Sequence, residues 1–294
     1  MHMPFANKIR PCAIFACMAL IVVAAHAATP KYDAIFVFGD SLCDVGNIYI
    51  YTKGAAPPPP YYDGRFSNGP IWVDHLASSL GLPMLPALKS GGTNYAIGGA
   101  WVTAPVVTPE GTILDVTQQV ETYLTDHKGK ADPKALYILE GGGNDILGAI
   151  ANGGGSASAL GAEIATDLSN NVATLRKAGA EHFLVTNLLN VAAAPAAAAN
   201  RSFASAATIA ANTTLTKLLG SEASSVLLLD EYTISLAIGA DKYHFGFTNV
   251  TTPCLSSTNN VCSDPDHTFF WDTVHPTEFG HSILATNAIT ALIQ

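Results

Sequence analysis

Short apolar runs alternate with longer helix-like stretches along this chain. Each run consists of aliphatic, β-branched or aromatic residues and ends at glycine or small polar residues, and nothing resembling a linker or an internal repeat interrupts the series. This alternation predicts one α/β domain built on a parallel sheet. The predicted strands are Ala34–Phe38, Asn94–Ile97, Leu136–Leu139, His182–Thr186 and Val226–Leu229. Helices are predicted over residues 115–127, 159–178 and 277–292, with another Ala-rich helix between the last two strands.

Small polar or glycine residues follow three of these predicted strands. Ser41, Gly98 and Asn144 each lie just past the carboxyl end of a run, and His275 lies on the loop that leads into the last predicted helix. Ligands of open parallel α/β sheets bind at the carboxyl ends of the strands. The sequence therefore predicts that these remote segments meet at one rim of the sheet.

Ser41 occupies the turn Phe38-Gly-Asp-Ser-Leu42. A serine at a strand-to-helix turn exposes its hydroxyl and directs its backbone N–H outward, which suits a nucleophile and an oxyanion donor. Serine is also a favoured helix N-cap. Taken alone, this serine fits either role.

Asp272 precedes His275 by three residues. A carboxylate at this spacing can accept the Nδ1–H of the ring and leave Nε2 free to take a proton from a serine. A capping Asp beside a surface His has the same spacing. Combined with Ser41, however, the pair supplies the remaining members of a Ser-His-Asp triad.

Gly98 and Asn144 supply candidate oxyanion donors. A glycine lets a backbone N–H approach an oxyanion closely, and an Asn side-chain amide adds a neutral donor. Both residues lie in sequences, Gly-Gly and Gly-Asn, that also occur in ordinary turns.

Taken together and in this order, the four segments resemble the GDSL branch of the SGNH hydrolase superfamily. The resemblance covers essentially the whole chain after residue 27. It rests on Phe38–Asn47 as the first block with Ser41 in the nucleophile place, Gly98 in the glycine block, Asn144 in the Gly-x-Asn-Asp block, and Asp272 with His275 in the Asp-x-x-His block.

The resemblance implies a three-layer α/β/α, flavodoxin-like fold with a central parallel sheet. It implies a serine esterase or lipase that hydrolyses acyl lipids or small acyl esters without a cofactor or a metal. Ser41, Asp272 and His275 would be catalytic, and the N–H groups of Ser41 and Gly98 with the Asn144 amide would form the oxyanion hole.

Two alternative functions stay open at this stage. Relatives in this superfamily also deacetylate polysaccharides, and an exported chain with an inherited catalytic fold can serve as a silent binding module. The apolar, aromatic loop from Ala55 to Phe66 favours acyl chains or phospholipids as substrates.

Residues 1–27 read as a signal peptide. Lys8 and Arg10 form a basic region, an apolar run follows from Cys12 to Ala25, and Ala25-His-Ala27 is a small-x-small cleavage site. A membrane anchor is the alternative, but the apolar run is short for a bilayer span. We therefore expect a secreted or periplasmic hydrolase domain over residues 28–294, with no membrane span after cleavage.

Three cysteines follow the predicted signal peptide. Cys254 and Cys262 bracket a polar, turn-rich segment, which in an exported protein predicts a local disulfide. Free thiols or metal ligands are the alternative. Acidic and histidine residues are dense over residues 264–275, but their spacing fits no common metal site. Cys43, which stands where many relatives have serine, is predicted to be a small buried residue.

The charge of the chain limits its partners. Only 13% of residues are charged, and the formal net charge is −9. This sign and the lack of a basic cluster argue against nucleic acid and anionic membrane surfaces as electrostatic partners. The expected partner is a small-molecule or lipid ester.

Overall fold

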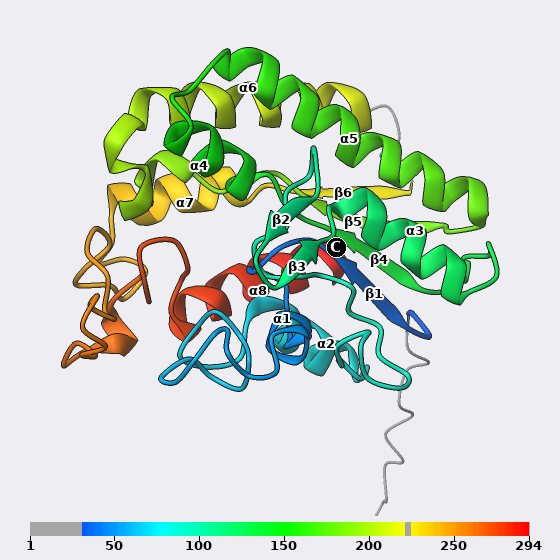
Figure 1. Cartoon of the computed structure of the whole chain (residues 1–294), viewed down its shortest axis with the longest axis horizontal. Helices are drawn as coiled ribbons and strands as arrows, with labels where there is room; N and C mark the ends of the chain where they lie inside the picture. The colour runs from blue at the N-terminus through cyan, green and yellow to red at the C-terminus, as the bar shows by residue number, and fades with distance from the viewer. Residues whose placement is uncertain (1–30, 221–224, 294) are drawn as a thin grey trace, which may run out of the picture.

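The computed structural model describes residues 31–220 and 225–293, and its centre is a four-stranded parallel sheet (Figure 1). Its strands, in the spatial order β1-β4-β5-β6, are β1 (Ile35–Phe38), β4 (Leu136–Leu139), β5 (His182–Thr186) and β6 (Val226–Leu229). Every neighbouring pair in this sheet is parallel. Four of the five predicted strands are thus confirmed.

The fifth predicted strand, Asn94–Ile97, is wrong as a regular strand. This segment runs beside β1, where Tyr95 N–H donates to Val37 O at 2.7 Å, but it forms only an isolated parallel bridge between Val37 and Asn94. The next bond of the ladder is missing because the Gly39 N–H donates to Gln119 Oε1 at 2.9 Å instead of to this segment. A side chain that accepts a strand's backbone donor in this way ends the ladder after one bridge.

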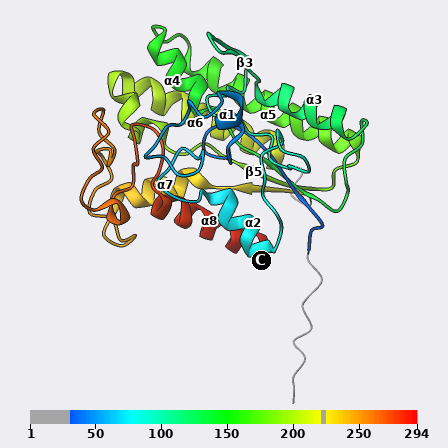
Figure 2. The same ribbon diagram turned by 60° about the horizontal axis from the view of Figure 1, so that its bottom comes forward.

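Successive strand residues face opposite sides of the sheet and build two separate cores. In β1, Phe36 and Phe38 pack into one core, whereas Ile35 and Val37 pack into the other. The period of two follows from the pleat of a strand that is buried on both faces. Figure 2 shows the helices divided between the two faces in the same way. The three-layer α/β/α architecture is therefore confirmed.

The long helices cover the two faces of the sheet. The first face carries α3 (Val116–Asp126), α5 (Ala157–Ala178) and α6 (Arg201–Leu219). The second carries α2 (Trp72–Leu80) and α8 (Glu278–Ile293). Helix α5 begins after Ser156, whose side chain accepts the Ala159 N–H, and ends at Gly179 with φ 115°, a left-handed conformation that glycine adopts at little cost.

Several short elements at the carboxyl edge of the sheet have no counterpart in the sequence prediction. They are too short for their apolar residues to show a clear period. They are α1 (Asn47–Tyr51), the hairpin β2 (Val106–Thr108) and β3 (Gly111–Ile113), α4 (Gly143–Ala151), α7 (Glu231–Ala240), and the 3₁₀ turns η1 (Val191–Ala193), η2 (Pro195–Asn200) and η4 (Pro265–His267).

The predicted disulfide between Cys254 and Cys262 is present. It closes a loop that is bound to the segment before Asp272, because Cys254 N–H donates to Phe270 O at 2.9 Å. Cys43 is buried and unpaired, as predicted.

The predicted signal peptide lies outside the described residues. Over residues 31–220 and 225–293, no helix combines the length and hydropathy needed to cross a bilayer.

Glu231 is a carboxyl group buried in the protein interior. It is 2% exposed, and its Oε1 has no hydrogen-bond partner among the described residues. Burial disfavours the charged form and raises the pKa of Glu231 from its ordinary value of 4.5 to about 8. The folded state therefore retains a proton that the unfolded chain releases above about pH 4.5.

Replacing Glu231 by Gln tests this. The free energy of unfolding of the wild type should fall as the pH rises from 4.5 toward 8, because over this range the unfolded chain loses a proton that the folded protein keeps. The free energy of unfolding of Glu231→Gln minus that of the wild type should therefore increase by about 1.4 kcal/mol per pH unit over this range. Urea unfolding at pH 5, 6.5 and 8 measures the difference. The exposed Glu121→Gln is the control, and a difference for Glu231→Gln that does not change with pH would contradict the assignment.

Candidate active site

The predicted rim residues converge on one groove at the carboxyl edge of the sheet. Ser41, Gly98, Asn144 and His275 all line it. Ser41 follows β1, Asn144 is the second residue of α4, and Gly98 follows the segment bridged to β1. The structure thus brings together four residues that are remote in the sequence.

A continuous chain of hydrogen bonds links Ser41, His275 and Asp272. The Ser41 Oγ lies 2.7 Å from His275 Nε2, and His275 Nδ1 lies 2.7 Å from Asp272 Oδ2. Ser41 is 5% exposed and His275 is 9% exposed. The contact between Ser41 and His275 and the contact between His275 and Asp272 are both within hydrogen-bond range, as a nucleophile, its base and the group that orients the base require.

Asp272 fixes the orientation of the histidine. Its Oδ1 accepts the backbone N–H of Val274 at 2.7 Å and of His275 at 2.8 Å, and the Tyr61 hydroxyl donates to Oδ2 at 2.7 Å. Burial alone would raise the pKa of Asp272, but the charge of His275 and the hydrogen bonds from His275 and Tyr61 lower the pKa to about 2. The carboxylate is therefore ionised at neutral pH.

Tyr61 has no counterpart in the sequence assignment of the site. It lies in a proline-rich loop more than two hundred residues before Asp272, and no local pattern connects the two. Its ring packs against Phe66 and Trp271, which positions the hydroxyl at the carboxylate.

Phe66 packs against the His275 ring and explains why residue 98 is glycine. The ring centroids of Phe66 and His275 lie 4.9 Å apart. A Cβ at residue 98 would stand 2.4 Å from Phe66 Cε2. The glycine thus permits the close approach of a ring that supports His275.

The structure gives the Gly98 N–H, which the sequence predicts as an oxyanion donor, a partner within the protein. This N–H donates to Asp44 Oδ2 at 2.8 Å, so its hydrogen is already taken. In the part of the chain that the structure describes, the N–H groups of Ser41 and Gly99 have no protein acceptor, and both residues line the groove.

Asn144 lies in the groove with its amide anchored. Its Nδ2 donates to Ala100 O at 3.0 Å and to Asp40 Oδ2 at 3.3 Å. Asp40 in turn lies against Glu140, whose Oε2 accepts the Asp40 N–H at 3.4 Å. Burial raises the pKa of both carboxyls. This buried acid pair beneath Ser41 was also not anticipated.

Asp44 ties the loop after β1 to the glycine loop. Its Oδ1 accepts the N–H groups of Gly46 at 2.8 Å and Asn47 at 2.6 Å, and its Oδ2 accepts those of Ile48 at 3.0 Å and Gly98 at 2.8 Å. One buried carboxylate thereby accepts the free backbone N–H groups at the start of α1 and positions the glycine loop that forms part of the groove wall.

Replacing Asp44 by Asn turns one of the two accepting oxygens into an amide donor, which faces backbone N–H groups. We expect the unfolding free energy to fall by about 1–3 kcal/mol, the cost of leaving buried donors unsatisfied. Urea denaturation measures it. The control is Asp63→Asn, whose carboxylate is 79% exposed and pairs with Arg65. Equal stabilities for the two variants would contradict this role of Asp44.

Comparison with known proteins identifies a family. A family model described as GDSL-like Lipase/Acylhydrolase matches residues 35–288. Lipase 1 of Photorhabdus luminescens is 32% identical over 179 residues, which cover 60% of this chain and 25% of that protein. The GDSL esterase/lipase ENOD8 of Medicago truncatula is 27% identical over 339 residues, which cover 90% and 87% of the two chains.

The fold has a match among solved structures. A member of the lipolytic G-D-S-L family from Veillonella parvula superposes with a TM-score of 0.50 at 16% identity, covering 89% of this chain and 98% of that one. This chain spans between 25% and 62% of the length of four bacterial relatives. With the family model matching nearly the whole described chain, this protein belongs to the GDSL-like lipase/acylhydrolase family.

Proposed function

We propose that this protein hydrolyses acyl esters through a Ser41–His275–Asp272 triad. The observation that carries the proposal is the pair of 2.7 Å contacts joining these three side chains at the lip of a groove. His275 removes the hydroxyl proton as Ser41 Oγ attacks the ester carbonyl. The protonated ring then gives that proton to the departing alcohol, and water hydrolyses the acyl-enzyme by the reverse roles.

The oxyanion of the tetrahedral intermediate would be held by neutral donors. We assign the backbone N–H groups of Ser41 and Gly99, with Gly98 replaced by Gly99. The side-chain amide of Asn144 would be the third donor, and it would have to exchange its longer hydrogen bond, 3.3 Å to Asp40 Oδ2, for one to the oxyanion. The support is that the first two N–H groups are free of protein acceptors and that Asn144 is anchored beside them. Removing one such donor typically lowers turnover by about 10²–10³.

We also propose that the protein is exported. The basic and apolar pattern of residues 1–27 supports a signal peptide ahead of a hydrolase domain at 28–294, and the Cys254–Cys262 disulfide suits an oxidising compartment.

Covalent labelling tests the triad. A fluorophosphonate reacts with an activated serine, so it should label the folded wild type and fail to label Ser41→Ala. His275→Ala should lose nearly all activity, and Asp272→Asn should lose about 10⁴ in kcat. Labelling and p-nitrophenyl ester hydrolysis provide the two readouts. A folded wild-type protein that neither reacts nor hydrolyses esters would instead support a silent binding module.

Tyr61→Phe tests the support of Asp272. The ring contacts remain but the hydrogen bond to the carboxylate is lost, and bonds to charged groups contribute about 1.5–3 kcal/mol. We expect kcat to fall by about tenfold or more and the melting temperature to fall by a few degrees. The matched control is Tyr62→Phe, the exposed neighbour. If both variants had wild-type kcat, Tyr61 would have no positioning role.

A further inference from the structure

Gln119 is a buried amide that lies behind the loop carrying Ser41. It belongs to α3 and is 1% exposed. Its Oε1 accepts the Gly39 N–H at 2.9 Å, while its Nε2 donates to the Gly39 carbonyl at 2.9 Å and to the Leu114 carbonyl at 3.4 Å. Two residues that face each other in an antiparallel sheet exchange the same pair of bonds. Gln119 therefore takes the place of a strand neighbour just past the end of β1.

Gly39 joins the two loops that carry the proposed backbone donors. It lies two residues before Ser41, and its carbonyl also accepts the Ile97 N–H at 3.1 Å. Ile97 lies two residues before Gly99 in the glycine loop. Both loops are thus attached to the one residue that Gln119 holds.

The third proposed donor is attached to the same framework. Asn144 Nδ2 donates to the Ala100 carbonyl at 3.0 Å, and the Ala100 N–H donates to the Ile97 carbonyl at 3.0 Å. Ile97 is in turn bonded to Gly39. The three proposed oxyanion donors therefore share a hydrogen-bonded framework that includes Gly39.

Gly39 can be held in place only through its backbone. A Cβ at this residue would stand 2.9 Å from the carbonyl oxygen of Glu140, closer than side chains tolerate, so the residue has no side chain to pack. Its N–H and its carbonyl both bind the Gln119 amide. Loss of that amide would leave a buried N–H without its partner, at a cost that favours movement of the loop.

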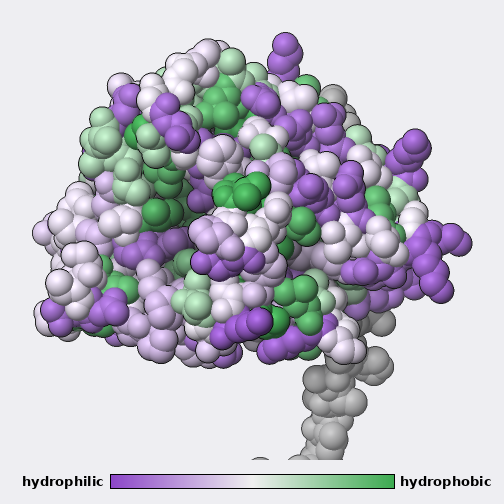
Figure 3. Space-filling model, viewed as in Figure 1, coloured by the Kyte–Doolittle hydropathy of each residue, from purple (hydrophilic) through white to green (hydrophobic). Residues whose placement is uncertain are grey.

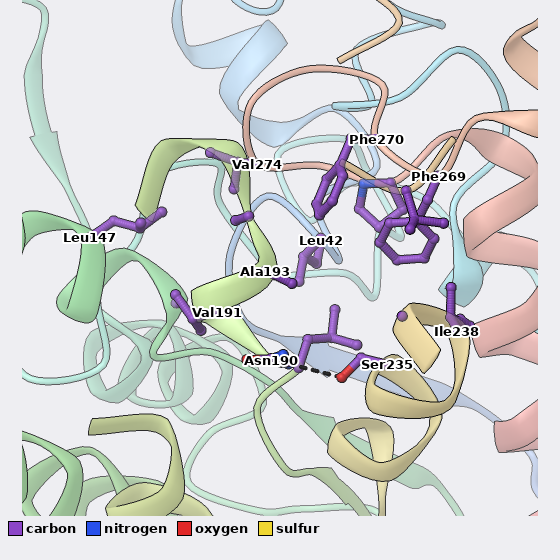
Figure 4. Close-up of a pocket in the computed structure, with 16 residues that line it drawn as sticks. Leu42, Leu147, Asn190, Val191, Ala193, Ser235, Ile238, Phe269, Phe270 and Val274 are labelled. Carbon is purple, nitrogen blue, oxygen red and sulfur yellow. Dashed lines mark hydrogen bonds between the residues drawn. The ribbon is translucent and has the colours of Figure 1, made fainter. Parts of the chain in front are cut away.

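The residues that follow Gly39 border cavities instead of packed core. Ser41 lines the groove, and Leu42 lines a second, apolar pocket between α4, η1 and α7, where Figure 4 shows it among other apolar side chains. Figure 3 shows apolar surface in a hollow between α4 and α7. A side chain beside a cavity lacks packing partners on that side. The hydrogen bonds behind the turn therefore matter more for its position.

We propose that Gln119 is a positioning residue for the proposed ester hydrolysis. Its amide fixes Gly39, and through Gly39 it sets the spacing between the Ser41 and Gly99 N–H groups that receive the oxyanion. The inference rests on the proposed function. Donors of this kind accelerate a reaction because they are in place before charge develops, so the group that places them affects turnover.

Gln119→Leu removes both bonds to Gly39 and tests this role. A misplacement of about 1 Å can lower a rate by about 10², so we expect kcat to fall by about 10–100-fold. The KM should stay within about twofold of wild type, because the donors bind the transition state more strongly than the substrate. Both constants are measured with p-nitrophenyl butyrate, and circular dichroism confirms that the variant is folded.

The matched control is Asn171→Leu, which removes another buried amide that binds α3. Asn171 is 2% exposed, and its Nδ2 donates to Thr117 Oγ1 at 3.1 Å. Loss of this bond should lower the melting temperature by a few degrees, as in Gln119→Leu. The kcat of the control should nevertheless equal that of wild type.

Gln119→Glu adds a readout that a purely structural role would not move. A protonated carboxyl can accept the Gly39 N–H and donate to the Gly39 carbonyl, whereas a carboxylate has no hydrogen to donate. Burial raises the pKa of a carboxyl above its ordinary value. The kcat of Gln119→Glu should therefore be close to that of wild type at pH 5.5 and fall toward that of Gln119→Leu by pH 9.5.

The quantity to compare is the ratio of variant to wild-type kcat at each pH, because the other ionisable groups around the site titrate in both proteins. These groups are Asp40, Asp44, Glu140, Asp145 and Glu231 behind the loops, Asp115 at the start of α3, and Asp272 with His275 in the groove. The control for the added carboxyl is Gln118→Glu, which can still accept the Asp115 N–H, now at 3.3 Å from Gln118 Oε1. Its ratio should stay near one at every pH.

Two results would overturn the role of Gln119 and leave the proposed function intact. One is a folded Gln119→Leu with wild-type kcat, and the other is a ratio for Gln119→Glu that does not change between pH 5.5 and 9.5. If Gln119→Leu does not fold, the pH dependence of Gln119→Glu decides alone. A wild-type protein that neither hydrolyses esters nor reacts with the fluorophosphonate is a separate result, since it overturns the triad itself.

Discussion

The arrangement at the rim depends first on the Asp272 carboxylate. It accepts hydrogen bonds from the Tyr61 hydroxyl, the His275 ring and two backbone N–H groups of its own loop. A buried carboxylate is costly unless it is paired, and this pairing fixes both the carboxylate and the imidazole. With Nδ1 held by Asp272, Nε2 has one direction left, toward Ser41. Loss of the carboxylate would leave the ring without an orientation.

Two other buried carboxyls organise the opposite wall of the groove. Asp44 binds four backbone N–H groups, and Asp40 anchors Asn144 while lying against Glu140. These groups bind backbone and amide hydrogens rather than cations. They set the positions of the loops that carry the proposed oxyanion donors, so the preorganisation of the site is built on hydrogen bonds beneath it.

Two cavities of different character lie at this rim of the sheet. The open groove contains His275 and the donors, whereas the pocket behind Leu42 and Val274 is lined mainly by hydrocarbon. The segment after α7 builds the outer wall of the pocket, and the Cys254–Cys262 loop is hydrogen-bonded to the same segment just before Asp272. A single irregular stretch thus carries both an apolar wall and two of the proposed catalytic residues.

The sequence by itself determined the sheet, the long helices, the disulfide and the family. Buried strands such as Leu136–Leu139 are apolar throughout, and helix ends such as Gly179 carry their own signals, so local chemistry suffices for them. Ser41, Asp272 and His275 were predicted as a triad because they lie in short ordered motifs. Only the tertiary structure decided that the Gly98 N–H donates to Asp44 and that the Tyr61 hydroxyl donates to Asp272. It also decided that a pocket lies beside Leu42. These features depend on distances between irregular loops remote in the chain, and no local period encodes such distances.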